Sequence, residues 1–373
     1  ACGLAPLALW FDDEFAAQLE WLRDELGAGK LSFTSRTRDE SLWTVGVSRD
    51  VDPGTAYLFN AEQLTLEKMY AVRPDLPKEF LARMEPIHYT ARDGVEIPAY
   101  LTLPPGSQGE DLPVVVNPHG GPWLRDKWGY SGTVQFLANR GYAVLQPNFR
   151  GSAGYGKEFL NAGNREWGTG VMQHDITDGV RYLIDEGIAD PERIAIYGGS
   201  YGGYAALAGL AFTPELYAAG VSVVGPSNLI TLIKTFPPYW EPGMARLKRR
   251  VGDVEDPQDR ERLKEQSPLF AVDQVSSPLL VVHGANDPRV AQNESDQIVA
   301  ALRDAGYPVK YLVAPDEGHG FVDELNRLAY LAATERFLAE HIGGRSQDEH
   351  RRAIEARLEQ LRVAVDEVEV GDE

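Results

Sequence analysis

Cysteine is nearly absent from this sequence of 373 residues, whose single cysteine is Cys2. Without a second cysteine, no disulfide can form within the chain, and no cysteine cluster can bind a metal ion. Such cysteine usage is typical of a reducing compartment, and the N-terminus shows no basic-then-apolar leader. The sequence therefore predicts a cytoplasmic location.

Long apolar runs and positive charge are also scarce. No stretch approaches the roughly 18 consecutive apolar residues of a membrane-spanning helix, so no membrane partner is expected. Lysine and arginine number 36 against 56 aspartates and glutamates, which gives a formal net charge of −20. This excess argues against a nucleic-acid partner, because phosphate groups repel negative charge.

Cofactor and metal motifs are missing as well. Gly151–Lys157 has the spacing of a phosphate-binding loop, but Glu158 follows where a serine or threonine should hold magnesium. The seven histidines include no pair four residues apart, the spacing of a zinc-binding helix. The sequence therefore predicts no cofactor and no metal.

Strand-like and helix-like segments alternate from about residue 95 to 342. Strands are expected at 95–103, 113–117, 142–147, 193–198, 219–224, 278–283 and 309–313. Helices are expected at 131–140, 174–187, 203–211, 291–305 and 324–341. This alternation predicts an α/β fold, with a mostly parallel sheet covered by helices on both faces. In such folds, chemistry takes place at the carboxyl ends of the strands.

A serine stands where one of these strands turns into a helix. The apolar run from Ile194 leads into Gly198-Gly-Ser-Tyr-Gly202, and a helical pattern follows directly. A G-x-S-x-G sequence is a weak signal in a chain with 37 glycines, but its strand–helix context is that of a nucleophile elbow. Ser200 is the predicted nucleophile.

A serine nucleophile needs a histidine base, which in this type of site follows it in the chain. His341 and His350 lie in helical or charged stretches and are interpreted as solvated. His283 ends an apolar run and is interpreted as structural. His319 lies in a glycine-flanked loop after a strand, where a general base belongs, and is the predicted base.

The acid that orients the base should follow a strand between the serine and the histidine. Asp287 lies in the turn after the strand at 278–283 and is the predicted acid. Asp316 shares the loop of His319 and is the fallback, although it follows the wrong strand.

The fourth part of such a site is a set of hydrogen-bond donors that stabilise the negative charge on the substrate oxygen during the reaction. Asn117-Pro-His-Gly-Gly-Pro122 follows an early strand, and its glycines present N–H groups without side chains in the way. Together with the N–H of Tyr201, they would form an oxyanion hole. Gly121 is the predicted second donor, with Gly120 as the alternative.

The two ends of the chain differ from its middle. The sequence predicts three divisions. Residues 1–85 contain a helix at 11–27 and a blade-like β segment at 31–35, 42–48 and 56–60. Residues 86–343 form the α/β domain, and residues 344–373 form a C-terminal helix and an acidic tail. The C-terminal helix carries an apolar stripe, formed by Ile354, Leu358, Leu361 and Val365. The stripe fits packing on its own domain or against another subunit, so a homo-oligomer is left open.

As a set, these motifs resemble the prolyl oligopeptidase family of serine peptidases, above all its acylaminoacyl-peptidase and dipeptidyl-peptidase branches. The matching segments are Asn117-Pro-His-Gly-Gly-Pro-Trp123, Asn148-Phe-Arg-Gly-Ser152, Gly198-Gly-Ser-Tyr-Gly-Gly-Tyr204, Asn286-Asp-Pro-Arg-Val290 and Glu317-Gly-His-Gly-Phe321, within roughly residues 86–342. The resemblance implies an α/β-hydrolase fold with a triad of Ser200, Asp287 and His319.

The same resemblance implies an oxyanion hole of Gly121 and Tyr201 and further substrate-binding residues. Arg289 would contact a substrate carbonyl, and Val290 and Tyr204 would wall the pocket for the residue before the scissile bond. A salt bridge within its loop is the alternative for Arg289.

The sequence departs from the family's pattern at its N-terminus. Family members carry a complete β-propeller, whereas only about one blade fits before residue 86. The chain is therefore either a piece of a longer protein or a compact enzyme with a small cap.

The predicted activity is hydrolysis of peptide or acylaminoacyl bonds in small peptides through an acyl-enzyme. A carboxylesterase acting on short-chain esters would use the same machinery and is the alternative. Esterases related to hormone-sensitive lipase usually have a third glycine where this chain has Pro122, which favours the peptidase. A third hypothesis, a non-catalytic hydrolase fold that binds partners, is weakened because such proteins generally lose a triad residue.

Overall fold

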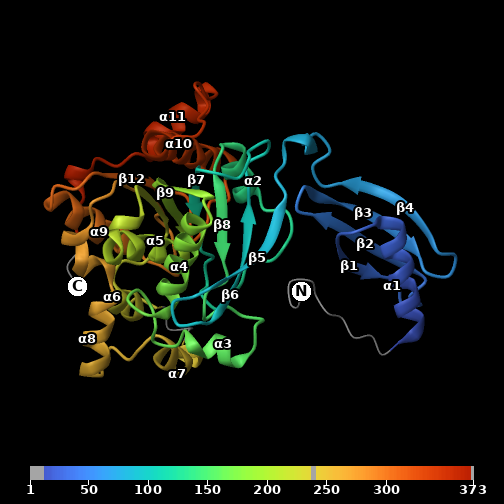
Figure 1. Ribbon diagram of the computed structural model, residues 1–373, viewed down its shortest axis with the longest axis horizontal. Helices are drawn as coiled ribbons and strands as arrows, with labels where there is room; N and C mark the ends of the chain where they lie inside the picture. The colour runs from blue at the N-terminus through green and yellow to red at the C-terminus, as the bar shows by residue number, and fades with distance from the viewer. Residues whose placement is uncertain (1–11, 237–240, 371–373) are drawn as a thin grey trace.

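The structure is a computed structural model that describes residues 12–236 and 241–370. It contains a large eight-stranded sheet and a small four-stranded sheet, which lie side by side in Figure 1. Cys2, residue 11 at the start of the first expected helix, and residues 371–373 of the acidic tail lie outside the described residues.

The large sheet has the strand order β12-β11-β10-β9-β7-β8-β6-β5. Its strands are β5 (Met84–Thr90), β6 (Glu96–Thr102), β7 (Leu112–Val116), β8 (Ala143–Pro147), β9 (Ala189–Gly199), β10 (Ala219–Val223), β11 (Leu279–Gly284) and β12 (Val309–Ala314). Strands β7 to β12 pair in parallel, whereas β6 is antiparallel to β8 and β5 is antiparallel to β6. Short valine-rich runs such as Leu112–Val116 form the centre because both faces of a parallel sheet are buried.

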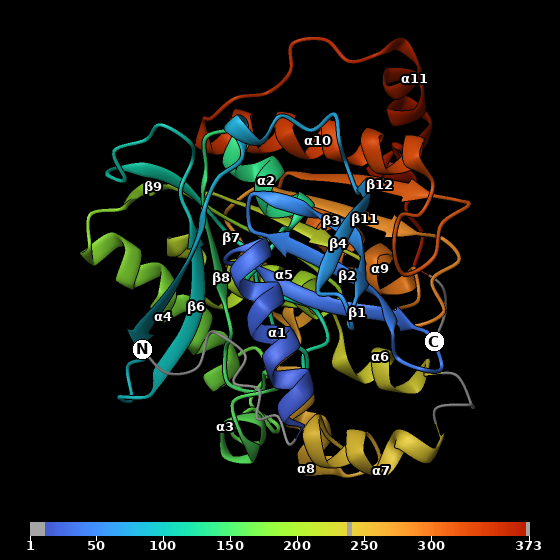
Figure 2. The same cartoon turned by 90° about the vertical axis from the view of Figure 1, so that its right-hand side faces the viewer.

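Helices cover both faces of this sheet. On one face lie α4 (Val171–Asp185), α5 (Tyr201–Phe212) and α9 (Asn293–Asp304), and on the other lie α2 (Gly132–Asn139), α10 (Glu324–Ile342) and α11 (Arg352–Leu361). Figure 2 shows α10 and α11 above the sheet and α4, α5 and α9 below it. The predicted α/β-hydrolase fold is therefore confirmed.

Several elements of the structure were not expected from the sequence. They are the edge strand β5 and the helices α3 (Lys157–Ala162), α6 (Leu229–Lys234), α7 (Glu241–Arg250) and α8 (Pro257–Glu265). The last three connect β10 to β11, and α7 and α8 lie at the foot of the molecule in Figure 1.

The N-terminal part forms a separate small unit. Helix α1 (Asp13–Leu26) packs on an antiparallel sheet in the order β1 (Lys30–Arg36), β2 (Leu42–Arg49), β3 (Asp52–Asn60) and β4 (Thr65–Ala71). Leu22, Trp43, Val45 and Phe59 form its core. The sequence predicted the helix and three strands of this unit, at 31–35, 42–48 and 56–60, but not the fourth strand β4.

A buried glutamine on α2 joins this unit to the large domain. The side chain of Gln135 donates to the carbonyl oxygens of Asp50 and Ala82 at 3.1 and 2.7 Å, and it accepts from the N–H of Ala82 at 2.8 Å. The Asp50 carboxylate accepts from the N–H of Met84, where β5 begins, at 2.9 Å. The predicted domain boundaries stay predictions.

The C-terminal helix packs on its own chain. Ile354, Leu358 and Leu361 are buried in the same cluster as α10. The N–H of Val363 then donates to Tyr311 of β12, at the open edge of the large sheet. The apolar stripe of this helix therefore packs on the α/β domain of the same chain.

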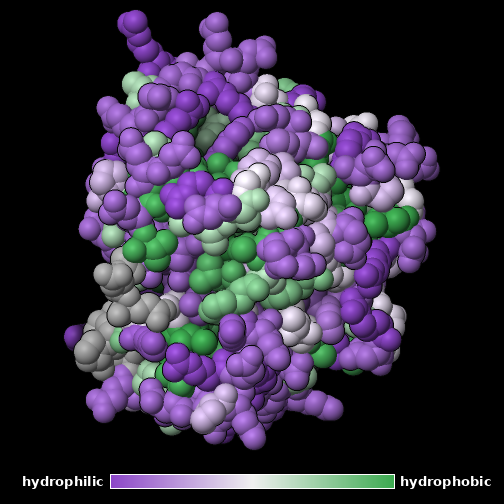
Figure 3. Space-filling view, turned by 90° about the vertical axis from the view of Figure 1, so that its left-hand side faces the viewer, coloured by the Kyte–Doolittle hydropathy of each residue, from purple (hydrophilic) through white to green (hydrophobic). Residues whose placement is uncertain are grey.

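The surface matches the polar composition of the chain. The face turned to the left in Figure 1 is covered mostly by hydrophilic residues, with smaller hydrophobic areas between them (Figure 3). Among the described residues, no helix is both long enough and apolar enough to cross a membrane.

Candidate active site

Ser200 lies on a sharp turn between β9 and α5. Its backbone has φ 58° and ψ −120°, a conformation that a residue with a side chain rarely adopts. Neighbouring glycines allow the turn: a Cβ at Gly198 would lie 2.3 Å from the carbonyl carbon of Gly202, and one at Gly202 would lie 2.2 Å from the Pro118 oxygen. The Ser200 N–H donates to Val223 of β10 at 2.8 Å, which fixes the turn to the sheet.

The structure brings the three predicted triad residues together. Nε2 of His319 lies 2.9 Å from Oγ of Ser200, and Nδ1 of His319 lies 2.6 Å from Oδ2 of Asp287. The two partners of His319 come from the carboxyl ends of different strands, β9 and β11, and His319 itself follows β12. The parallel sheet creates this proximity, because it brings the carboxyl ends of these strands to one edge.

Asp287 is held in its ionised form. Burial opposes its ionisation, but hydrogen bonds from His319 and from the N–H groups of Val290 and Arg289 outweigh it and lower the pKa of this carboxyl. The Asp287 side chain is fully shielded from solvent. It is therefore suited to fix the tautomer and orientation of the His319 ring.

The other residues weighed as base or acid have structural contacts. His283 is fully buried, its Nε2 donating to the Val290 oxygen and its Nδ1 accepting from Ser295. The fallback acid Asp316 pairs with Arg357 at 2.7 Å.

The interpretation of His350 as solvated was wrong. Its side chain is 8% exposed, and Nε2 lies 2.8 Å from a carboxylate oxygen of the buried Glu335. The charged sequence around His350 concealed this, because His350 lies in the loop before α11, whereas its partner lies on α10. His341 is half-buried against the edge of Phe337.

The predicted oxyanion donors lie close to the serine. Tyr201 is the first residue of α5, so its N–H has no partner within the helix. A Cβ at Gly120 would lie 3.4 Å from Cβ of Ser200, so this loop runs directly past the nucleophile. Gly121 follows with φ +125°, a conformation that favours glycine.

His119 fixes this loop, a role that the sequence did not reveal. Its Nδ1 donates to the Gly120 oxygen at 2.9 Å, and its Nε2 lies 2.8 Å from Oγ of Ser152. Its ring stacks on Phe149 with a centroid distance of 4.5 Å. Burial lowers the pKa of His119 to about 4, so the ring is neutral at physiological pH.

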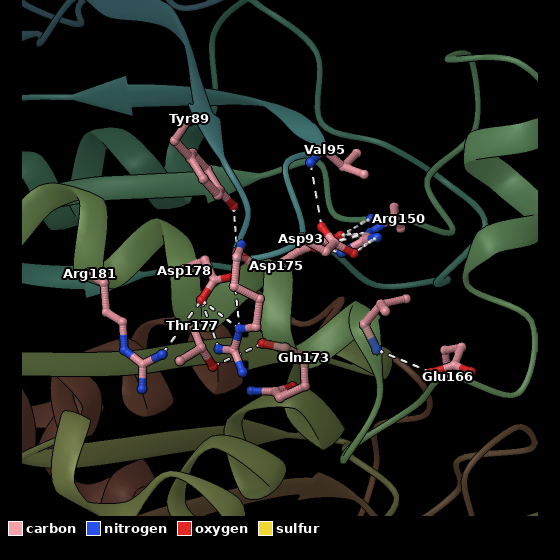
Figure 4. A network of polar contacts seen from close by, with 12 residues as sticks. Tyr89, Asp93, Val95, Arg150, Glu166, Gln173, Asp175, Thr177, Asp178 and Arg181 are labelled. Atoms are coloured by element: carbon pink, nitrogen blue, oxygen red, sulfur yellow. Dashed lines mark hydrogen bonds and ion pairs between the residues drawn. The ribbon is translucent and has the colours of Figure 1, made fainter.

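Arg150 lies in a network of polar contacts with acidic side chains (Figure 4). The Arg150 guanidinium binds both oxygens of the buried Asp175, and its backbone N–H donates to that carboxylate at 2.8 Å. Asp93 binds the guanidinium from the other side. Arg150 therefore anchors the segment that carries Phe149 and Ser152, rather than reaching the nucleophile.

The three expected substrate-binding residues differ in their surroundings. Arg289 is exposed and forms no ion pair among the described residues. Val290 is buried, with its N–H bound to Asp287. Tyr204 is fully buried, and its hydroxyl donates to the Gln266 oxygen at 2.6 Å. None of the three lines the cavity that contains Ser200.

That cavity has a volume of about 410 Å³ and includes Ser200, His319 and Gly120 in its wall. Within residues 12–236 and 241–370, no group of three or more histidine, cysteine, aspartate or glutamate side chains is placed to hold a metal ion. The chemistry that the site can perform is acyl transfer by an activated serine.

This fold and this arrangement of side chains define a serine hydrolase of the α/β-hydrolase class. A comparison with protein families narrows the class further, because residues 128–345 match the prolyl oligopeptidase family. The chain belongs to that family, which confirms the resemblance seen in the sequence.

Two curated relatives match most of this chain. It is 46% identical to dipeptidyl aminopeptidase BIII of Pseudoxanthomonas mexicana over 343 residues, covering 90% of this chain and 50% of the relative. It is 42% identical to dipeptidyl peptidase family member 6 of Caenorhabditis elegans over 358 residues, covering 90% of this chain and 48% of the relative. The chain thus spans about half the length of these relatives.

Among solved structures, a puromycin-hydrolysing peptidase of Mycobacterium tuberculosis superimposes with a TM-score of 0.75 at 28% identity. The match covers 82% of this chain and 47% of that one.

Proposed function

We propose that this chain is the catalytic part of a serine peptidase that hydrolyses short peptides through an acyl-enzyme. Ser200 is the nucleophile, His319 the general base and Asp287 the residue that orients it. The observation that carries this proposal is the continuous hydrogen-bonded series from Asp287 through His319 to Ser200, at 2.6 and 2.9 Å.

The geometry supports a two-step reaction. His319 takes the proton of Ser200 as its Oγ attacks the substrate carbonyl, and the negative charge forms on the carbonyl oxygen. The N–H groups of Tyr201 and Gly121 donate to that oxygen. His319 then passes its proton to the leaving amine, and a water molecule repeats the sequence to release the acyl group.

Substrates with a free N-terminus are part of the proposal. The relatives that share 46% and 42% identity are named as dipeptidyl peptidases, whereas the acylamino-acid-releasing enzyme of Arabidopsis thaliana shares 31% over 57% of this chain. These names favour dipeptide release over removal of a blocked residue. They also favour peptides over the short-chain esters of the alternative hypothesis.

We assign supporting roles to the remaining predicted residues. Arg289 is exposed beside Asp287 and is available to contact a substrate carbonyl. Val290 is bonded to Asp287, and the ring centroid of Tyr204 lies 5.5 Å from that of Tyr201. In this proposal both residues help to wall the pocket for the residue before the scissile bond.

The cytoplasmic location also stays part of the proposal, supported by the single cysteine. Cell fractionation of the native protein tests it, and recovery outside the cytoplasm would contradict it.

The decisive experiment compares the chain with its Ser200→Ala variant on three substrate types. These are dipeptidyl-p-nitroanilides, N-acylaminoacyl-p-nitroanilides and short-chain p-nitrophenyl esters. We expect serine-dependent cleavage of the anilides, with a higher kcat/KM for the free than for the blocked N-terminus. Turnover of esters alone would contradict the proposal, and so would a failure of Ser200 to react with a fluorophosphonate.

Replacing Asp287 tests the triad further. Asp287→Asn should lower kcat by about 10⁴ because the amide holds His319 in the wrong tautomer. Asp316→Asn is the matched control, since that carboxylate follows β12 and binds Arg357 instead. Near-normal kcat in Asp287→Asn would remove this residue from the mechanism.

A further inference from the structure

The cavity that contains Ser200 does not reach the residues that we assign to the acyl pocket. It shares Ser200, His319 and Gly120 with the catalytic centre but includes neither Tyr201 nor Val290. It continues between α2 and α10, where Thr133 and Tyr330 line it. Because His319 delivers a proton to the leaving amine, the leaving part of a substrate departs on the His319 side. The cavity is therefore placed to hold that part.

The inner end of this cavity offers hydrogen-bond acceptors. Asp126 follows the loop that carries the proposed oxyanion donor Gly121, and Gln146 lies near the end of β8. Oδ2 of Asp126 and Oε1 of Gln146 are shielded from solvent and have no hydrogen-bond partner, although the Gln146 side chain contacts the Asp126 carboxyl and moderates the effect of burial on its pKa. Burial also raises the pKa of Asp126 to about 7. Buried acceptors without partners are costly, which makes N–H donors of a ligand favourable at this end.

The outer end of the cavity carries the positive charge of Arg327. Arg327 lies in the first turns of α10, is exposed, and lines the same cavity. No ion pair of its guanidinium is found among the described residues, although acidic side chains outnumber basic ones in this chain. A free guanidinium beside a binding cavity is suited to a carboxylate, which it can bind with two hydrogen bonds.

We propose that this cavity binds the leaving part of a short peptide, and that Arg327 recognises its C-terminal carboxylate. The inference rests on the proposed peptidase function and adds a substrate class to it: peptides that end within one or two residues after the scissile bond. A volume of about 410 Å³ suits so short a segment, since it lies at the small end of the range of about 300–1,000 Å³ for ligand sites. The amide N–H groups of the segment would face Asp126 and Gln146.

The test uses one tetrapeptide in two forms, with a free C-terminal carboxylate or a carboxamide. Binding is measured by calorimetry to Ser200→Ala, which removes turnover, and kcat/KM is measured with the intact serine. We expect the acid to bind about tenfold or more tightly than the amide, as is usual for a charge-assisted pair. Arg327→Gln should abolish that ratio in both measurements.

Arg352→Gln is the matched control. Arg352 begins α11, is exposed, does not line the cavity, and likewise has no ion pair among the described residues. This variant should keep the preference for the acid. Equal binding of the two peptides, binding of neither, or a preference that survives Arg327→Gln would overturn the inference. Cleavage of anilides by the intact serine reports on the proposed function separately.

Discussion

At the scale of single residues, His119 illustrates how a side chain can act on the reaction without touching substrate. The carbonyl of Gly120 and the N–H of Gly121 belong to one peptide unit, and in a planar trans peptide they point in opposite directions. The hydrogen bond from His119 to the Gly120 oxygen therefore also fixes the direction of the Gly121 N–H. His119 is a positioning residue for the proposed oxyanion donor.

His119→Phe tests this role because phenylalanine can keep the stacking on Phe149 while losing both hydrogen bonds. We expect kcat to fall about 10- to 100-fold, less than the 10²–10³ typical of deleting a donor. Steady-state kinetics on an anilide should show the loss in kcat rather than in KM. Ser152→Ala removes only the second partner and should have a smaller effect. An unchanged kcat in His119→Phe would contradict the role.

At the scale of elements, the turn from β9 to α5 depends on close backbone contacts. Gly202→Ala would place a Cβ 2.2 Å from the Pro118 oxygen, so the loop that contains Pro118 or helix α5 must move. We expect loss of fluorophosphonate labelling together with a lower melting temperature. Gly132→Ala, at the start of α2, meets no atom within 4 Å and should leave both unchanged. A fully active Gly202→Ala would show that the turn tolerates displacement.

Helix α9 is joined to the segment before α6 by a buried carboxylate. Glu294 accepts from the N–H groups of Ser227 and Asn228 and from the hydroxyl of Thr231. Burial nevertheless raises its pKa from 4.5 to about 7. Because the folded pKa is the higher one, protonation of Glu294 favours folding below pH 4.5, and this contribution is lost as the pH rises through 7.

Glu294→Gln should remove this pH dependence, since glutamine stays neutral. Relative to the variant, the unmodified chain should lose about 3 kcal/mol of unfolding free energy between pH 4.5 and 7. Urea denaturation of both proteins at several pH values measures the difference. A difference that stays constant across this range would mean that Glu294 does not titrate as described.

The elements that the sequence did not reveal lack a periodic apolar signal. Strand β4 is mostly exposed, and charged residues make up half of α7 and most of α8. Strand β5 contains Pro86, and proline is tolerated there because β5 is the edge of the sheet. The buried parallel strands were predictable because continuous apolar runs bounded by glycine, proline and aspartate are typical of them.

The site was predictable where chemistry imposes an order on the chain, and not where support comes from distant side chains. Ser200, Asp287 and His319 follow the order of one catalytic arrangement, so their meeting could be inferred. The contact of His119 with Ser152 and that of His350 with Glu335 depend on the packing of separate segments. No sequence motif predicts contacts of this kind.

At the scale of the whole molecule, the small N-terminal unit depends on few polar contacts with the large domain. Gln135→Leu would leave the N–H and carbonyl of Ala82 and the carbonyl of Asp50 without their partner. Each buried group left unpaired costs about 1–3 kcal/mol. Limited proteolysis should then cut between the unit and the domain.

Gln258→Leu on the surface of α8 is the control, with an expected change within about 0.5 kcal/mol. Equal stability and equal protease resistance of Gln135→Leu would show that other contacts hold the unit.

The parallel sheet also has a consequence for how the protein folds. Ser200 and His319 are 119 residues apart, and β7 lies between β8 and β9, so neighbouring strands are separated by long stretches of chain. Pairings of this kind close large loops before they gain contacts, which slows folding. Ser200 meets His319 only after β9, β11 and β12 have taken their places. Activity should therefore recover only at the last stage of refolding. A chain whose sheet is incompletely paired would be collapsed but inactive.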